Sequence, residues 1–238
     1  MDQFLDKYIF PHTRGWFGWS KKTTDGLPVY TAREERLNMI SHIIGILIGF
    51  GMLNVSIFSH HSELGLVGGV IFSLSLIVLY TASSVYHGTG MKDTRLKKLL
   101  RLLDHCSIFV LIAGTCTPLM LCMIERRPAD TEWFFYAVVW ALALGGITLL
   151  CVDMKRFKSI SVVMYVMMGA LMMLRAELLS TLIGDTATRL IVGGGLSYLI
   201  GLLFYGLGSQ NEWMHAVFHV FCLMGSVLHC VCIAGYVI

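Results

Sequence analysis

The chain has 238 residues, of which 56% are hydrophobic and only 14% are charged. A soluble domain would carry roughly 25% charged residues, so the composition indicates an integral membrane protein and not a soluble domain with a large core. The net charge is only +3 and no basic patch alternates with aromatic residues, so we expect no nucleic-acid partner.

Residues 1–37 form an aromatic and basic leader ahead of the first apolar segment. Aromatic rings beside lysine and arginine suit the membrane–water interface, so this leader is either an interfacial helix or a partly ordered cytoplasmic tail. No cleavable signal peptide is visible, and we expect the first apolar segment itself to direct insertion. Residues 38–238 are taken as the membrane domain.

Seven apolar segments follow the leader, and most reach the ~20 residues that a helix needs to cross the hydrocarbon core. They lie near 40–59, 64–86, 102–124, 133–153, 158–176, 188–208 and 213–237. The fifth is the least clear, because its apolar run from Ile160 to Leu174 is short and Arg175 follows. Unbroken apolar runs exclude a transmembrane barrel. The sequence therefore predicts an all-α integral membrane protein, a bundle of seven transmembrane helices.

The basic residues predict the orientation of this bundle. With the N-terminus in the cytoplasm, fourteen lysines and arginines fall in the inner segments and four in the outer segments. An excess of this kind on the cytoplasmic side is the positive-inside pattern. We therefore expect a cytoplasmic N-terminus, an external C-terminus and a location in the plasma membrane.

Four of the predicted spans carry polar groups near their cytoplasmic ends, although such groups are costly inside a membrane. They are Glu35, Asn38 and His42 in the first span, Ser83 and His87 in the second, Asp104 in the third, and His215 and His219 in the seventh. Residues four apart share a helix face, so the last two imidazoles point the same way. The topology alone brings all these groups to one leaflet, which favours a shared site.

The residue types at this leaflet suit a metal centre. A catalytic zinc takes three protein ligands and leaves one position for water, and His87, His215 and His219 can supply three neutral imidazoles. Water on the metal becomes a nucleophile near neutral pH, and Asp104 is placed to accept its proton. Ser83 lies one turn before His87 and can hydrogen-bond a ligand or a substrate carbonyl. Nickel, cobalt and iron also bind imidazole, so the pattern favours zinc without requiring it.

Other interpretations stay open for several of these residues. His42 is either a polar packing residue or, with Glu35 and Asn38, part of the support around the ligands. Asp104 is either a catalytic base or an ion-pair partner of a basic neighbour. His229 lies about 15 Å beyond the histidine pair along the seventh span, so we expect it to hydrogen-bond between helices.

The motifs that carry the strongest family signal are Glu34-Glu35-x-x-Asn38-x-x-x-His42, Ser83-x-x-x-His87, Asp104-His105, Ala113-Gly114-Thr115-x-Thr117-Pro118 and His215-x-x-x-His219. Together they resemble the hemolysin III family, the bacterial branch of the progestin and adiponectin Q receptor family, in a superfamily that includes alkaline ceramidases. The resemblance implies a seven-helix fold with a zinc ion near the cytoplasmic leaflet. It places the zinc ligands on His87, His215 and His219, and the family's serine and aspartate on Ser83 and Asp104.

Three functions are compatible with this pattern. The first is a zinc-dependent hydrolase of an amide or ester bond in a membrane lipid, with ceramide as the family-level analogue. The second is a zinc-containing sensor or regulator without turnover, in which a fully ligated metal ties the second span to the seventh. The third is a metal-free proton or ion relay. A cytolysin, which the family's historical label suggests, has no separate lytic segment to support it. Membrane lipids are the expected partners.

Overall fold

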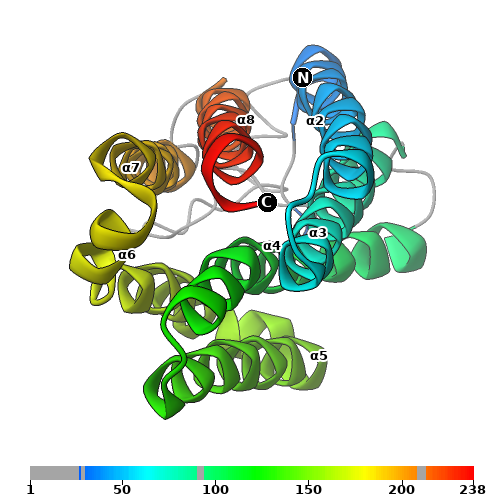
Figure 1. Ribbon diagram of the computed structural model, residues 1–238. Coiled ribbons are helices and arrows are strands. Elements are labelled where there is room, and N and C mark those ends of the chain that lie inside the picture. The colour runs from blue at the N-terminus through cyan, green and yellow to red at the C-terminus, as the bar shows by residue number, and fades with distance from the viewer. Residues whose placement is uncertain (1–26, 28–29, 90–93, 208–212) are drawn as a thin grey trace, which may run out of the picture.

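The computed structural model describes residue 27 and residues 30–89, 94–207 and 213–238, and contains helices and no strands in this part of the chain (Figure 1). The helices are α2 (Ala32–Phe58), α3 (Glu63–Gly88), α4 (Thr94–Arg126), α5 (Asp130–Met173), α6 (Ala176–Ile183), α7 (Asp185–Leu207) and α8 (Met214–Cys232). A short π-helix, η1 (Ile233–Val237), continues α8. The described residues therefore agree with the predicted all-α class.

Six helices are long and apolar enough to cross a membrane, namely α2, α3, α4, α5, α7 and α8 with η1. They present large apolar side chains on their outer surfaces, for example Leu47, Leu144 and Leu203, each more than half exposed. Exposure of such side chains to water is unfavourable, whereas lipid tails solvate them well. The chain is a multi-pass integral membrane protein.

The first of these helices shows how polar residues are sorted inside the bundle. On α2, the buried face carries polar and small residues, whereas the exposed face is apolar. The buried residues include Asn38, His42, Gly45, Gly49 and Ser56, and the exposed ones include Ile40, Ile43, Leu47 and Phe50. Small residues let neighbouring helices approach closely, and the polar groups find partners only in the interior.

The start of α2 is fixed by a capping box and lies within the predicted leader. The Thr31 side chain accepts a hydrogen bond from the Glu34 N–H, and the Glu34 side chain accepts one from the Thr31 N–H. This reciprocal pair satisfies two N–H groups that a helix start leaves without partners. Residues 32–37 of the predicted leader therefore belong to a membrane-length helix, whereas residues 1–26 and 28–29, on which the rest of the interfacial prediction depends, lie outside the described residues.

The long helix α5 contains the predicted fourth and fifth spans. It has 44 residues and would be about 66 Å long if straight, roughly twice the thickness of the hydrocarbon core. It breaks at Asp153, whose backbone is extended at φ −157° and ψ 94°, and the Asp153 carboxylate accepts a hydrogen bond from the Arg156 N–H. After the break the chain turns back, because Arg175 forms a two-pronged ion pair with Glu132 in the first turn of α5.

The packing order brings the first and last described helices together. In Figure 1, α4 lies between α3 and α5, and it is the most buried of the membrane-length helices. On the other side of the bundle, α8 packs between α7 and α2. The helix that begins the membrane domain therefore lies beside the helix that ends it, and this contact shapes the site described next.

Candidate metal centre

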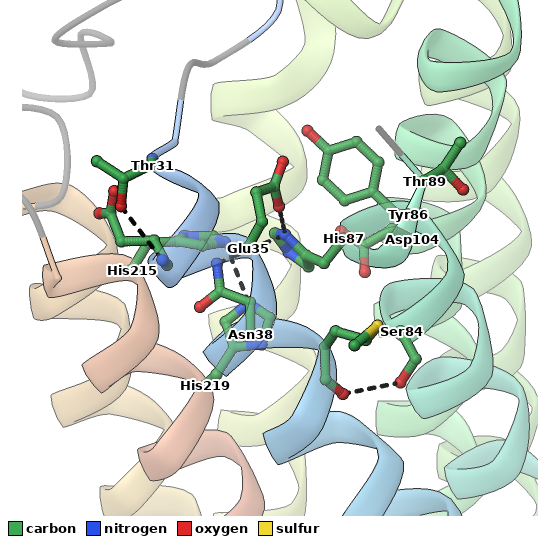
Figure 2. A network of polar contacts seen from close by, with 12 residues as sticks. Thr31, Glu35, Asn38, Ser84, Tyr86, His87, Thr89, Asp104, His215 and His219 are labelled. Carbon is green, nitrogen blue, oxygen red and sulfur yellow. Dashed lines mark hydrogen bonds and ion pairs between the residues drawn. The ribbon is translucent and has the colours of Figure 1, made fainter. Parts of the chain in front are cut away.

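Three histidines from two helices converge at one end of the bundle (Figure 2). His87 lies in the last turn of α3, whereas His215 and His219 lie in the first two turns of α8. Their ligand nitrogens are all within 4.8 Å of one another, and the two Nε2 atoms of His215 and His219 are 3.0 Å apart. Two imidazoles on a tetrahedral zinc would place these nitrogens ~3.3 Å apart, so the cluster can hold a metal ion.

The hydrogen bonds of His87 favour the tautomer that a metal ligand needs. Its Nδ1 lies 2.5 Å from Glu35 Oε2, so the ring proton belongs on Nδ1, where it donates to the carboxylate. Its Nε2 is buried and has no hydrogen-bond partner among the described residues. A carboxylate that orients a ligand histidine in this way is the usual arrangement around protein-bound metals. The Asn38 amide nitrogen lies 3.5 Å from the same Nδ1.

A buried lysine, Lys97 on α4, completes this network. Its Nζ donates to Glu35 Oε1 at 3.2 Å and to the carbonyl oxygens of Tyr86 and Thr89 at 2.5 and 2.7 Å. Both carbonyls belong to the end of α3, so the ammonium group caps that helix. The same group holds the carboxylate of Glu35, which is the hydrogen-bond partner of His87. From the sequence, Lys97 was interpreted as an inner basic charge and as one possible ion-pair partner of Asp104, and its contact with Glu35 was not predicted. The available sequence signal for a role at the site was its position seven residues before Asp104, which places the two side chains on the same face of one helix.

The predicted catalytic pair lies on two helices beside the imidazoles, with Ser83 one turn before His87 on α3 and Asp104 on α4. The Ser83 side chain hydrogen-bonds the Asp104 carboxylate, which therefore bridges α3 and α4. The Asp104 carboxylate also lies 3.6 Å from His105 Nδ1. Neither Ser83 nor Asp104 hydrogen-bonds the three imidazoles in the described parts of the chain.

His42 lies against the metal cluster without joining it. Its ring stacks on His219 with centroids 3.9 Å apart and makes a T-shaped contact with Tyr80, with centroids 4.9 Å apart. Both of its ring nitrogens are buried and lack partners among the described residues. His229 behaves as expected, because its Nε2 lies 3.2 Å from the carbonyl oxygen of Ile191 on the neighbouring α7.

Two further residues at the site were not identified from the sequence. Tyr30, just before α2, stacks on His215 with centroids 4.8 Å apart and lies 5.7 Å from the His87 ring. Burial raises the pKa of Tyr30 well above its usual value, so the phenol is neutral at physiological pH. The second residue is Glu34, which is only 4% exposed and is therefore not a solvated charge. Its carboxylate accepts a hydrogen bond from the Trp213 N–H, directly before α8.

Comparison with known proteins agrees with these observations. The family model described as haemolysin-III related matches residues 30–230. The chain is 34% identical to the "Hemolysin-3 homolog" of Bacillus subtilis over 211 residues, which cover 87% of this chain and 96% of that protein. It is 31% identical to the "Hemolysin-3" of Bacillus cereus over 87% of this chain and 93% of that protein. The human "Monocyte to macrophage differentiation factor" is 24% identical over 67% of this chain and 66% of its own length.

Proposed function

Because the chain belongs to the haemolysin III family, we propose that it is a zinc-dependent hydrolase that cleaves an amide or ester bond of a membrane lipid at the cytoplasmic leaflet. In this proposal His87, His215 and His219 hold the zinc, and the protein spans the plasma membrane seven times with its N-terminus inside. The superfamily that includes this family and the alkaline ceramidases suggests the substrate class by analogy, and the residues of the site suggest the reaction class.

The number of ligands is the observation that carries the proposal. The group of closely spaced ligand atoms contains three histidines and no fourth histidine, cysteine or carboxylate from the described residues. Structural zinc sites are closed by four protein ligands, whereas catalytic sites have three and keep a position for water or substrate. A three-histidine site therefore favours a catalytic metal over a purely structural one.

The surrounding residues have distinct tasks in this mechanism. Zinc, when bound, supplies a water molecule that ionises near neutral pH. Glu35 holds the proton of His87 on Nδ1 and so keeps Nε2 free for the metal. Asp104 is the base that accepts the proton of the attacking water and returns it to the leaving group. Ser83 orients the Asp104 carboxylate through their hydrogen bond.

Metal analysis tests the ligand set before any substrate is chosen. We expect the purified protein to contain one zinc per chain, and His87→Ala or His215→Ala to lose it, because each removes a ligand from a three-ligand site. His61→Ala is the matched control, since His61 is exposed in the α2–α3 connection and should leave the metal content unchanged. A chain purified from native membranes without stoichiometric metal would point instead to the proton or ion relay.

Turnover is tested separately with a panel of lipids that carry amide and ester bonds. Asp104→Asn should keep the zinc but slow fatty-acid release about 10²–10⁴-fold, the usual contribution of a general base. His219→Ala should abolish release because it removes a ligand. Hydrolysis that survives in His219→Ala would contradict the proposal. Full zinc content with no turnover on any lipid would assign the protein to the sensor or regulator class.

A further inference from the structure

The first turn of α2 holds the chain segment that starts α8. One oxygen of the Glu34 carboxylate accepts the Thr31 N–H at 2.7 Å, and the other accepts the Trp213 N–H at 2.8 Å. The first contact is local, whereas the second joins residues 179 positions apart. A capping box requires only the first contact, so the second oxygen is available for a tertiary role.

The segment that Glu34 holds is locally strained. Trp213 has φ 71° and ψ −18°, and it is the one non-glycine residue with positive φ among the described residues. Side chains disfavour this left-handed conformation, so it persists only where surrounding contacts enforce it. The residue also precedes α8 without a side-chain cap, and a carboxylate near a helix start complements the helix dipole. The Glu34 contact therefore stabilises a turn that the local sequence does not favour.

This turn sets the position of a metal ligand. His215 lies two residues after Trp213, and Tyr30, on the α2 side of the same contact, stacks on its ring. His87 is held by Glu35, the neighbour of Glu34 in α2. Adjacent carboxylates at the start of α2 thus hold the two halves of the histidine cluster, one from α3 and one from α8.

We propose that Glu34 is a positioning residue for the metal centre, which clamps the start of α8 and places His215 against His87. This inference rests on the metal site proposed above. Its chemistry differs from that of Glu35, because Glu34 acts on the backbone of Trp213 and not on an imidazole. Groups that orient metal ligands are typically worth 10–100-fold in metal affinity.

The clamp is tested first on the metal-free protein by hydrogen–deuterium exchange. In Glu34→Gln, one carboxylate oxygen becomes an amide nitrogen that cannot accept a hydrogen bond. The Trp213 amide should then exchange faster than in the wild type. Thr31→Ala is the matched control, because it removes the Thr31 hydroxyl from the same capping box and leaves the Glu34 carboxylate intact. That variant should keep the Trp213 protection.

The consequence is then measured by titrating the same proteins with Zn²⁺ and by recording the visible spectrum of the Co²⁺ form. We expect Glu34→Gln to weaken metal binding at least about tenfold and to alter the Co²⁺ spectrum, with Thr31→Ala unchanged in both. Unchanged Trp213 protection or unchanged affinity in Glu34→Gln, while the wild type binds metal, would overturn the clamp alone. A wild type that binds no metal would overturn the proposed function.

Discussion

At the scale of single residues, Lys97 illustrates how a charge becomes tolerable inside the bundle. It is only 1% exposed, yet its three ammonium donors have three acceptors, which are Glu35 and the carbonyls of Tyr86 and Thr89. A buried charge is stable only when it is paired and hydrogen-bonded in this way. The ion pair therefore depends on the end of α3, where the two carbonyl acceptors flank His87 in the sequence.

Replacing this lysine gives a direct test of its role. Lys97→Met keeps the apolar stem but leaves the Glu35 carboxylate and two carbonyl groups without their donor. We expect a loss of about 3–5 kcal/mol of unfolding free energy, the usual effect of breaking one partner of a buried ion pair. Denaturation in detergent micelles measures it. Lys98→Met is the control, because that neighbouring side chain is exposed; equal stability of the two variants would contradict the role of Lys97.

The residues that the sequence predicted at the site differ from those it missed in how their positions are determined. The i and i+4 spacing of His215 and His219 and the depth of His87 follow from helix geometry and membrane topology, so their convergence was predictable. Lys97 and Glu34 act through contacts with residues 62 and 179 positions away in the chain. Such pairings depend on the packing of α2 against α4 and α8, which hydropathy and charge do not specify.

At the scale of helices, close packing of α2 on α3 depends on a glycine beside the site. A Cβ atom on Gly45 would lie 2.4 Å from the Tyr80 ring, which is far inside van der Waals contact. The ring cannot simply rotate away, because its hydroxyl donates to Ser226 on α8 and its edge contacts His42. The glycine therefore lets α2, α3 and α8 meet just beyond the histidine cluster.

A pair of alanine substitutions on α2 separates this packing effect from helix propensity. Gly45→Ala should destabilise the protein by about 1–3 kcal/mol, because the extra methyl group overpacks the interface with Tyr80. Gly51→Ala on the same helix should be neutral or slightly stabilising, since no atom lies within 4 Å of its added Cβ. Unfolding in detergent compares the two, and similar midpoints would show that the contact with Tyr80 is not tight.

The helix boundaries show the limit of a hydropathy-based prediction. The fourth and fifth spans were expected as separate segments with a polar connection near Lys155 and Lys158. Instead, helical residues continue on both sides of a single extended residue, Asp153. The aspartate both breaks the helix and caps its continuation through the Arg156 N–H, so a connection of several residues is unnecessary. A hydropathy value averaged over a sequence window does not detect a side-chain cap of this kind.

At the scale of the whole molecule, the course of α5 decides the number of membrane crossings. If α5 crossed once, its two ends would lie on opposite sides of the membrane. The ion pair between Glu132 and Arg175 instead joins residues at the two ends of α5. Three basic residues, Lys155, Arg156 and Lys158, follow the break and favour the cytoplasmic side. Both observations favour two crossings within α5, and hence seven crossings in total.

Cysteine accessibility distinguishes seven crossings from six. In a background without native cysteines, we expect Arg156→Cys to react with a membrane-impermeant maleimide only after the cells are permeabilised. Leu174→Cys, 69% exposed just beyond α5, should react in intact cells, because a second crossing returns the chain to the outside. Arg127→Cys, ahead of α5, should also react in intact cells and serves as the outer control. Protection of Leu174→Cys in intact cells would mean that α5 crosses once. The start of α8 would then lie at the opposite leaflet from the end of α3, which contradicts the contact of His215 and His219 with His87.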